Sequence, residues 1–332
     1  MAPRPRTLLL TRSDVARLLT LDDAIVAVEQ AFRLHGERRA PPPGVLGVHA
    51  EGGGFHIKAG LLHLDRSYFA AKLNANFFAN AEKLGIPNIQ GVVLLSDGAN
   101  GTPLAVMDSI EITIQRTGAA TAVAARRLAR PDSKAATICG CGNQGRVQLR
   151  ALTRVLPIQK AFAWDAGREH AKKFAAEMSS ELGIGVTAAD DLAKAVGQSD
   201  VCITCTPSKK WFLGREHVRP GTFVAGVGAD NEDKQELDPR LLAGNKVVVD
   251  VLDQCATIGD LHHALAAGLL TREAVHAELG EVVAGAKPGR TSAEEITIFD
   301  STGMALQDVA AAVIVYQRAL AAGAGKSIAF AD

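Results

Sequence analysis

The sequence has no excess of charge of either sign, few aromatic residues and no long apolar run. Its 36 basic and 36 acidic residues give a formal net charge of zero, and aromatic residues make up 5% of the chain. Without a basic stripe or aromatic platforms, we expect no nucleic-acid partner. No apolar run reaches the roughly 18 residues of a bilayer span, so we expect no membrane partner either.

Cysteine is scarce too, and its spacing does not complete a metal site. The pairs Cys139/Cys141 and Cys202/Cys205 lie in or beside apolar strand-like runs, and neither has a second half-site. We therefore interpret them as small buried side chains and predict no metal. Unpaired cysteines indicate a reducing compartment, and the apolar run at residues 7–10 is too short for a signal peptide. Both observations predict a cytoplasmic protein.

The length of 332 residues exceeds the roughly 250–300 at which one core stops growing, so we expect two domains. Residues 12–36 have the apolar spacing of a helix that Ser13 or Asp14 caps. Short strand-like runs follow up to residue 107, and they predict an antiparallel sheet with this helix packed on it. A second helix is predicted from Thr117 to Ala129.

From Ala135 onward strands alternate with helices, which is typical of a doubly wound parallel sheet. We predict an α/β protein with a central Rossmann domain at residues 121–303 and an α+β domain at residues 1–120 plus 304–332. The apolar helix Met304–Ala322 is expected to return to the first domain or to form a subunit contact. The predicted strands of the parallel sheet are Ala135–Cys139, Ala161–Trp164, Val201–Thr204, Thr222–Val227, Lys246–Val251 and Ile296–Phe299.

The segment Gly140-Cys141-Gly142-Asn143-Gln144-Gly145 has the spacing of a dinucleotide-binding loop. It follows an apolar strand and precedes a helix, as that function requires. Gly140 permits a tight turn, Gly142 lets the backbone approach a diphosphate, and Gly145 lets the helix pack on the strand. The helix N-terminus offers free N–H groups and partial positive charge. The alternative is a glycine-rich turn in an unrelated α/β domain.

Asp165 ends the next strand, 20 residues after Gly145. A carboxylate there binds ribose hydroxyls and repels a 2′-phosphate, so NAD is favoured over NADP. Arg168 nearby offers a phosphate partner and keeps NADP as the alternative. The segment 323–327 resembles the end of a phosphate loop but lacks its first glycine, and we interpret it as a flexible tail.

Other candidates for chemistry come from strands and strand ends. Lys72 and Lys58 lie in apolar strands, where each is either solvent-facing or a desolvated carboxylate ligand with a lowered pKa. His56 is two residues from Lys58 and shares its face. Arg116, placed just before the helix expected at Thr117, suits a carboxylate or phosphate clamp. The alternatives are a structural histidine and a surface arginine.

Asp230 follows the strand Thr222–Val227, at the sheet edge where ligands collect. A carboxylate there can act as a general base or stabilise an iminium, and the alternative is an ordinary loop aspartate. Residues 300–303 follow the last strand in the same way, and their N–H groups are expected to approach the cofactor. The sequence contains neither a GxSxG nor an HExxH motif.

Taken together, these motifs resemble the ornithine cyclodeaminase/mu-crystallin family over nearly the whole chain. The segments that carry the resemblance are Arg116–Ala120, Gly140–Gly145, Gly228–Asp230 with Lys234–Pro239, Glu278–Glu281 and Phe299–Gly303. The resemblance implies a homodimer whose substrate-binding and dimerisation domain combines the N-terminal part with the final helix. It also implies hydride transfer at the Cα–N bond of a small amino or imino acid.

The resemblance also implies roles for single residues. Asp230 and Lys72 are the catalytic candidates, and Asp230 would serve as the acid/base or iminium-stabilising group. The candidate substrate-binding residues are His56, Lys58, Lys72, Arg116 and Thr302. The candidate cofactor-binding residues are Asn88, Arg116, Thr117, Gly140, Gly142, Asn143, Gln144, Gly145, Asp165, Thr204, Thr206, Lys234 and Ser301.

One segment departs from the family pattern. Where cyclodeaminases carry an acidic residue and then Met-Pro, this chain has His56-Ile57-Lys58-Ala59-Gly60. A more positive pocket disfavours a diamino substrate and favours a neutral or acidic side chain. The leading hypothesis is therefore an NAD(H)-dependent imino-acid reductase or amino-acid dehydrogenase. The alternatives are an ornithine cyclodeaminase that recycles NAD and a non-catalytic NAD(P)H-binding protein.

Overall fold

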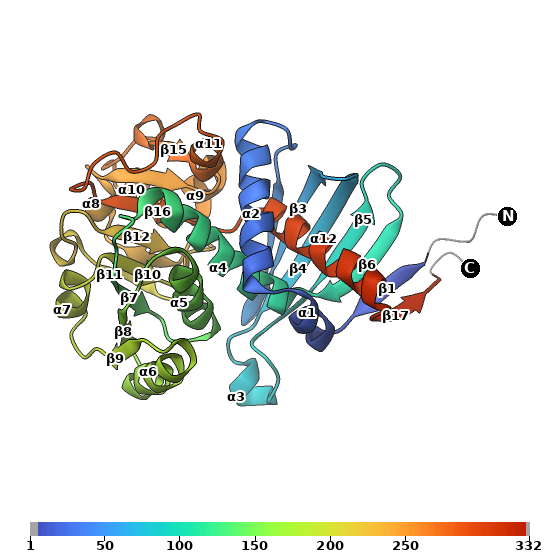
Figure 1. The fold of residues 1–332 in the computed structure, drawn as a ribbon, viewed down its shortest axis with the longest axis horizontal. Helices are drawn as coiled ribbons and strands as arrows, with labels where there is room; N and C mark the ends of the chain where they lie inside the picture. Colours follow the sequence, from blue (N-terminus) through green and yellow to red (C-terminus); the bar gives the residue numbers. More distant parts are fainter. Residues whose placement is uncertain (1–5, 330–332) are drawn as a thin grey trace. The chain divides into compact units, whose positions relative to one another are not determined.

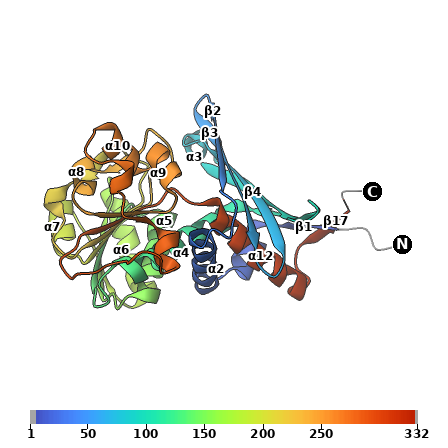
Figure 2. The same ribbon diagram turned by 90° about the horizontal axis from the view of Figure 1, so that it is seen from above.

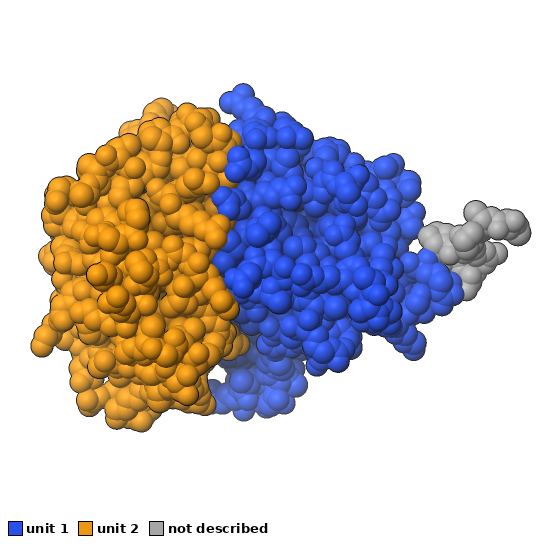
Figure 3. All heavy atoms as spheres, in the orientation of Figure 1, with its two compact units in different colours: residues 1–116, 304–332 blue, residues 117–303 orange. Residues whose placement is uncertain are grey.

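The computed structural model describes residues 6–329. The chain forms two compact units, Met1–Arg116 with Met304–Asp332 and Thr117–Gly303 (Figure 3). The first division lies inside helix α4 (Ser109–Leu128), before the 120/121 boundary expected from the sequence. None of the helices in the described residues is long and apolar enough to cross a membrane.

Unit 1 is built on a largely antiparallel sheet (Figure 1). In the described residues its strand order is β17-β1-β6-β5-β4-β3-β2, with β1 parallel to β6 and antiparallel to β17. Its strands are β1 (Thr7–Leu10), β2 (Gly44–Ala50), β3 (Gly53–His63), β4 (Ser67–Asn76), β5 (Ile89–Asp97), β6 (Pro103–Asp108) and β17 (Lys326–Ile328). Its helices are α1 (Arg12–Leu18), α2 (Leu21–Gly36), α3 (Asn80–Leu84) and α12 (Ala305–Ala322).

Helices cover one face of this sheet. Figure 2 shows α2 and α12 along the same side, and α12 packs on β3, β4 and β5. On β4 the side chains alternate, so Tyr68, Ala70 and Lys72 are buried while Leu73 is exposed. Gly60 lies directly under α12, because a Cβ at this position would meet the Leu306 side chain. The helix face of the sheet therefore forms the core of unit 1.

Two expectations about the ends of unit 1 were wrong. The helix expected at residues 12–36 is two helices, because Thr11 and Thr20 each begin a capping box with the aspartate three residues later. Ser13 and Asp14 are thus not the cap, although Asp14 completes the first box. The tail at 323–327 is not irregular throughout, since Lys326–Ile328 pairs with β1.

Unit 2 has the predicted doubly wound architecture, with helices on both faces of a parallel sheet (Figure 2). In the described residues the strand order is β15-β14-β16-β12-β10-β7-β8-β9. Its strands are β7 (Ala135–Cys139), β8 (Lys160–Trp164), β9 (Gly185–Ala188), β10 (Val201–Thr204), β12 (Phe223–Gly226), β14 (Lys246–Val249), β15 (Ala277–Glu278) and β16 (Thr297–Asp300). Strands β11 (Lys209–Leu213) and β13 (Gln235–Leu237) form a separate pair. Besides part of α4, its α-helices are α5 (Asn143–Val155), α6 (Arg168–Leu182), α7 (Leu192–Gly197), α8 (Pro239–Leu242), α9 (Leu252–Ile258), α10 (Asp260–Ala266) and α11 (Leu279–Val283), and its 3-10 turns are η1 (Arg215–His217) and η2 (Arg272–Ala274).

The strand order reverses direction between β7 and β10. The chain runs from β7 outward through β8 to β9 and then returns to β10 on the other side of β7. In open α/β sheets, ligands bind at the carboxyl ends of the strands beside such a switch point. The loops that follow β7 and β10 are therefore the expected ligand-binding edge.

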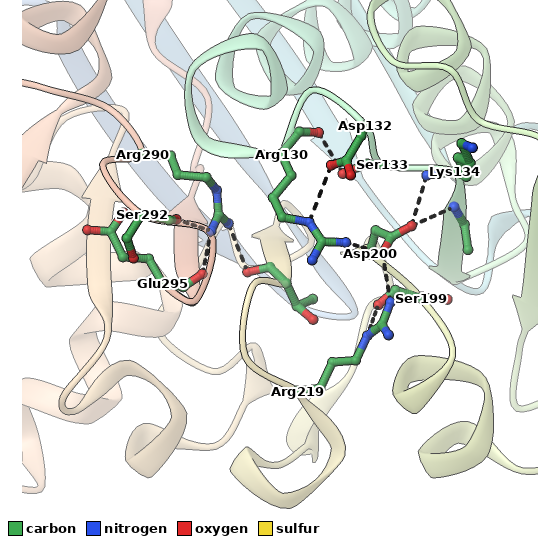
Figure 4. A network of polar contacts seen from close by, with 12 residues as sticks. Arg130, Asp132, Ser133, Lys134, Ser199, Asp200, Arg219, Arg290, Ser292 and Glu295 are labelled. Carbon is green, nitrogen blue, oxygen red and sulfur yellow. Dashed lines mark hydrogen bonds and ion pairs between the residues drawn. The ribbon is translucent and has the colours of Figure 1, made fainter.

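The opposite, amino-terminal edge is held by a charged network (Figure 4). Asp200, just before β10, accepts hydrogen bonds from the side chains of Arg130 and Arg219 at 2.6 and 2.7 Å. Its second oxygen accepts the backbone N–H groups of Lys134 and Ala135 at the start of β7. The network fixes how β7 and β10 enter the sheet, and we interpret it as structural.

Candidate active site

Three basic side chains are buried on the helix face of the unit 1 sheet. Lys58 on β3 lies directly opposite Lys72 on β4, and both are less than a tenth exposed. Arg116, in α4, is also buried. Lys72 is therefore desolvated, which is one of the two alternatives that the sequence left open. The other alternative, a solvent-facing lysine, is wrong. The strand alternation places His56 on the same face as Lys58, where it is half-buried.

One carboxylate, Asp308 of α12, lies among these basic groups. The Lys72 Nζ atom donates a hydrogen bond of 2.9 Å to Asp308 Oδ1. The Arg116 Nε atom lies 3.2 Å from the same oxygen. Arg116 Nη1 also donates to Gln307 Oε1 at 3.1 Å. The final helix therefore supplies both acceptors that hold the basic groups in place.

Burial and neighbouring charge decide how this cluster titrates. Burial, together with the positive charge of Arg116 and Lys58, lowers the pKa of Lys72 to about 7, and Asp308 opposes the shift. Burial raises the pKa of Asp308, but the charges of Lys72 and Arg116 outweigh it and hold that pKa below its usual value. At neutral pH Asp308 is therefore ionised and Lys72 is close to its midpoint.

Positive charge gathers around Asp308. Lys58, Lys72 and Arg116 all act on this carboxylate and lower its pKa. The Nε2 group of Gln307 is buried and has no hydrogen-bond partner among the described residues. A buried donor left without an acceptor is costly, and so is uncompensated charge. A small carboxylate ligand would satisfy both, so this arrangement suits a carboxylate-binding site.

The expected position of Arg116 at a helix start was wrong. Helix α4 begins at Ser109, because the Asp108 side chain accepts the backbone N–H groups of Ile110 and Glu111 as a cap. Arg116 therefore lies within the helix, where no free N–H groups assist it. Its ability to bind an anion depends on the buried cluster instead.

The glycine loop of unit 2 has the predicted geometry. Gly140 has a φ of +104°, and a Cβ there would lie 2.8 Å from the Cys205 carbonyl oxygen. A Cβ at Gly145 would collide with the Gly140 carbonyl. Gly142 is different, because no atom lies within 4 Å of the position its Cβ would take. The loop therefore has no room for a side chain at Gly140 or Gly145, but it has free space at Gly142.

The open side of the loop fits a diphosphate. Helix α5 begins directly after Gly142, which has no side-chain cap, so the first N–H groups of the helix remain available. Gln144, the second residue of the helix, lies beside them. Asn143 is the first residue of the helix and shares this end. These groups meet the requirements of a dinucleotide phosphate site.

Asp165 follows β8 and braces the loop. Its Oδ2 atom accepts the Cys141 N–H at 2.8 Å, and its Oδ1 atom accepts the Gly167 N–H at 2.9 Å. His170 Nδ1 also lies 3.5 Å from Oδ1. A carboxylate has about four acceptor positions, so capacity remains for a ribose hydroxyl. Arg168 is paired with Asp190 at 2.9 Å, which reduces its availability for a 2′-phosphate.

The turns after β10 and β12 contain further predicted residues. The hydroxyls of Thr204 and Thr206 both donate to the buried carboxylate of Glu236, at 2.8 and 2.7 Å. Asp230 accepts a hydrogen bond of 2.6 Å from Lys234 Nζ. The two candidates Asp230 and Lys234 therefore form an ion pair.

The remaining candidates lie elsewhere. Ser301 and Thr302 both donate their hydroxyls to buried Asp250, at 3.1 and 3.2 Å. Thr117 is buried in α4 within unit 2, whereas Asn88 belongs to unit 1. The Asn88 side-chain oxygen accepts the Ala81 N–H at the start of α3. The candidates thus fall into a cationic group in unit 1 and a strand-end group in unit 2, with Asn88 apart.

Sequence reasoning missed Asp308 and Glu236. A signal for Asp308 existed, because it is the only charged residue between Met304 and Gln317 in an otherwise apolar helix. A buried face that carries one carboxylate indicates a basic partner. Glu236 had no comparable signal, since the segment around it is rich in charge.

The structure combines a parallel sheet, an open glycine loop and a buried cationic cluster. Together these features define a two-domain protein of Rossmann type. The comparison with known families makes this specific. The model of the ornithine cyclodeaminase/mu-crystallin family matches residues 6–323, and the chain belongs to that family.

Its relatives are enzymes of amino and imino acids. The chain is 41% identical to an alanine dehydrogenase of Archaeoglobus fulgidus over 98% of both sequences. An archaeal alanine dehydrogenase dimer with bound NAD matches with a TM-score of 0.93 and 41% identity, over 98% of this chain and 99% of that one. The Δ1-pyrroline-2-carboxylate reductase of Thermococcus litoralis, solved with NADH and L-proline, matches with a TM-score of 0.91 and 36% identity, over 97% of this chain and 100% of that one.

Proposed function

We propose that this protein is an NAD(H)-dependent imino-acid reductase or amino-acid dehydrogenase that acts on a small 2-imino or 2-amino acid. The observation that carries the proposal is the buried cluster of Lys58, Lys72 and Arg116 around Asp308. Its excess positive charge suits the carboxylate that every such substrate carries. The relatives, which act on alanine and on a cyclic imino acid, support the same class.

In this proposal the substrate carboxylate binds to Arg116 and Lys72, with Lys58 adding positive charge. The guanidinium offers several donors in one plane, and the orphaned Nε2 of Gln307 offers another. Lys72, which already donates to Asp308, gains a second carboxylate partner when the substrate arrives. Binding therefore raises the pKa of Lys72 from about 7 and fixes its proton.

Asp230 is proposed to act at the nitrogen of the substrate. As a carboxylate it stabilises a protonated imine, and it accepts or returns the nitrogen proton. Lys234, whose Nζ lies 2.6 Å from Asp230 Oδ1, holds the Asp230 side chain in place. Thr302 is retained as a substrate contact and His56 as a neighbour of Lys58.

The proposed cofactor is NAD, with NADP as the less favoured alternative. The residues that would hold it are those of the glycine loop, with Asp165 at the ribose. Bound nicotinamide supplies or accepts the hydride. Two structural neighbours contain NAD or NADH, and the Arg168–Asp190 pair weakens the case for a 2′-phosphate partner. The other cofactor candidates, Asn88, Arg116, Thr117, Thr204, Thr206, Lys234 and Ser301, stay proposals.

Lys58 bears on the substrate's side chain. It is buried beside Lys72, where a second ammonium from ornithine would add repulsion in a desolvated site. A neutral or acidic side chain avoids this cost. The reductase or dehydrogenase is therefore preferred over a cyclodeaminase.

We also propose a homodimer formed through the uncovered face of the unit 1 sheet. Ile57, Leu73 and Val92 stand in register across β3, β4 and β5 on the side opposite α12. Leu73 and Val92 are about two-fifths exposed. An apolar face of this kind marks a protein interface, and the archaeal alanine dehydrogenase is a dimer.

Light scattering should give a dimer for the wild type and a monomer for Val92→Arg. The control is Val26→Arg, at an exposed position of α2, and this variant should stay dimeric. A monomeric wild type would contradict the proposal.

All five cysteines are free, which supports a proposed site of action in a reducing compartment such as the cytoplasm.

The direct test is NADH oxidation with a panel of 2-oxo acids in the presence of ammonia or methylamine. The proposal expects turnover that requires the amine, with neutral or acidic side chains preferred. Conversion of ornithine to proline and ammonia without net NADH change would establish the cyclodeaminase instead. Tight NADH binding with no turnover on any substrate would favour the non-catalytic alternative.

A further inference from the structure

Glu236 of unit 2 has no basic partner in the described residues, and the proposed function gives it no role. Its side chain is fully buried on β13. The hydrogen bonds that it accepts come from two different turns. Oε1 accepts the backbone N–H and hydroxyl of Thr206 at 2.6 and 2.7 Å. Oε2 accepts the Thr204 hydroxyl at 2.8 Å and the Gly228 N–H at 2.9 Å.

These two turns have different tasks in the proposed site. The first follows β10 and packs on the glycine loop, because a Cβ at Gly140 would lie 2.8 Å from the Cys205 carbonyl oxygen. The second, Gly228-Ala229-Asp230, carries the proposed acid/base residue. A Cβ at Gly228 would lie 2.5 Å from both Glu236 Oε2 and the Thr206 carbonyl oxygen. The two turns therefore meet at Glu236, with no room for a side chain between them.

Glu236 is itself fixed by further buried carboxylates. Asp260, at the start of α10, accepts the N–H groups of Glu236 and Leu237 at 2.8 and 2.9 Å. Asp300, at the end of β16, accepts the N–H of Leu261 at 2.8 Å. Asp260 thus fixes the backbone that carries Glu236, and Asp300 fixes the backbone next to Asp260. This arrangement sets the position of the Glu236 side chain from behind.

We infer that Glu236 is a positioning residue that joins the turn bearing Asp230 to the turn against the dinucleotide loop. Its four acceptor positions are all used, so an amide cannot satisfy every donor, and a shorter acid does not reach both turns. The inference rests on the proposed function for its consequence, which is correct placement of Asp230 relative to bound NADH. The hydrogen bonds that define it stand independently of that function.

The test compares Glu236→Gln with Asp238→Asn in the full-length protein. The Glu236→Gln change keeps the shape of the side chain but turns an NH₂ group toward an N–H or hydroxyl donor. Asp238 is a matched control, because it is buried two residues away but caps α8 and pairs with Arg240 instead. NADH affinity is measured by nicotinamide fluorescence on folded protein. We expect the dissociation constant to rise about tenfold in Glu236→Gln, as for one unsatisfied buried donor, and to stay unchanged in the control.

Steady-state kinetics separate positioning from general damage. Loss of folded protein lowers kcat but leaves the NADH dissociation constant of the remaining molecules unchanged. Misplacement of the two turns weakens NADH binding and lowers kcat, while KM for the 2-oxo acid, whose proposed carboxylate ligands Lys72 and Arg116 belong to unit 1, changes less than the NADH dissociation constant. Glu236→Asp, too short to reach both turns, should not rescue. An NADH affinity and kcat equal to those of Asp238→Asn would overturn the inference.

Two further measurements keep the inference testable. If Glu236→Gln fails to fold, Thr204→Val removes one of the donors from a fully buried position and should accelerate amide exchange at Gly228, which shares Glu236 Oε2 with Thr204. If the wild type binds no NADH, the proposed function fails, but amide hydrogen exchange still tests the positioning role. Exchange at Thr206 and Gly228 should accelerate in Glu236→Gln and not in Asp238→Asn. Unchanged exchange would contradict the role.

Discussion

Lys72 and Asp308, 236 positions apart in the sequence, form a buried ion pair with 2.9 Å between Nζ and Oδ1. The pair joins strand β4 to the final helix α12. It also holds the lysine that we propose as a substrate ligand. The pair therefore links the stability of unit 1 to the chemistry of its carboxylate site.

Asp308→Asn should destabilise the protein by about 3–5 kcal/mol, because it leaves Lys72 and Arg116 buried without their counter-ion. Chemical denaturation measures this loss. The matched control is Glu181→Gln, which removes an exposed pair with Arg150 and should cost less than about 1 kcal/mol. Equal effects for the two variants would show that the Asp308 pair is not the buried contact described.

The pKa of Lys72 predicts how stability depends on pH. Its folded-state pKa of about 7 lies below the ordinary value of 10.5, so the unfolded chain binds more protons between those values. Stability contributed by this group is therefore lowest below pH 7 and rises between about pH 7 and 10.5, by several kcal/mol at most. Denaturation of wild type and Lys72→Met across this window measures it. As pH rises, the free energy of unfolding of the wild type should increase relative to that of Lys72→Met. A constant difference between the two proteins would contradict the assignment.

The same pKa predicts a pH dependence of substrate capture. The protonated Lys72 ammonium binds the substrate carboxylate, so kcat/KM for the 2-oxo acid should fall as pH rises above about 7. In Lys72→Met, kcat/KM should already be low and should not show this decline above about pH 7. A limb of the same position and depth in both proteins would assign the titration to another group.

Asp230→Asn should leave the NADH dissociation constant within about twofold of the wild type and nearly abolish turnover. The amide keeps the size of the side chain but neither stabilises an iminium nor moves a proton, and such groups contribute roughly 10²–10⁴-fold. Fluorescence titration and single-turnover kinetics measure the two effects. Retained activity would mean that Asp230 does not have the proposed role.

Asp165→Ser should shift cofactor preference toward NADPH. The change removes the negative charge that repels a 2′-phosphate and the acceptor for ribose hydroxyls. The ratio of the NADPH and NADH dissociation constants should change about tenfold or more, the equivalent of one charge-assisted hydrogen bond. Because Asp165 also braces Cys141 and Gly167, some loss for both cofactors is expected. An unchanged ratio would place the selectivity elsewhere.

The parts of the fold that local sequence controls could be predicted. The bounds of β7 match the predicted ones and α5 begins at Asn143, because an apolar run, three glycines and a helix follow one another within a short segment. The Rossmann unit and the family were confirmed for the same reason, since several such motifs occur in order. The roles of Asp230 and the other site residues stay predictions.

The rest depended on contacts that sequence spacing does not reveal. The burial of Lys72 is explained only by Asp308, which α12 brings back from the end of the chain. The predicted start of α4 at Thr117 was wrong because Asp108 caps the helix and begins it at Ser109. Lys326–Ile328 becomes a strand only because β1 offers it a free edge. For Lys72 and for Lys326–Ile328 a distant partner decides the local structure, whereas a local cap decides the start of α4.

The most direct test of the account follows one hydrogen atom. The enzyme is incubated with NADH deuterated at C4 of the nicotinamide, a 2-oxo acid and ammonia, and the amino acid product is analysed by mass spectrometry and NMR. The account predicts deuterium at Cα of the product from the transferred face of NADH, with loss of that product in Asp230→Asn. An amino acid without deuterium at Cα, or no NADH consumption with any 2-oxo acid and amine, would contradict it.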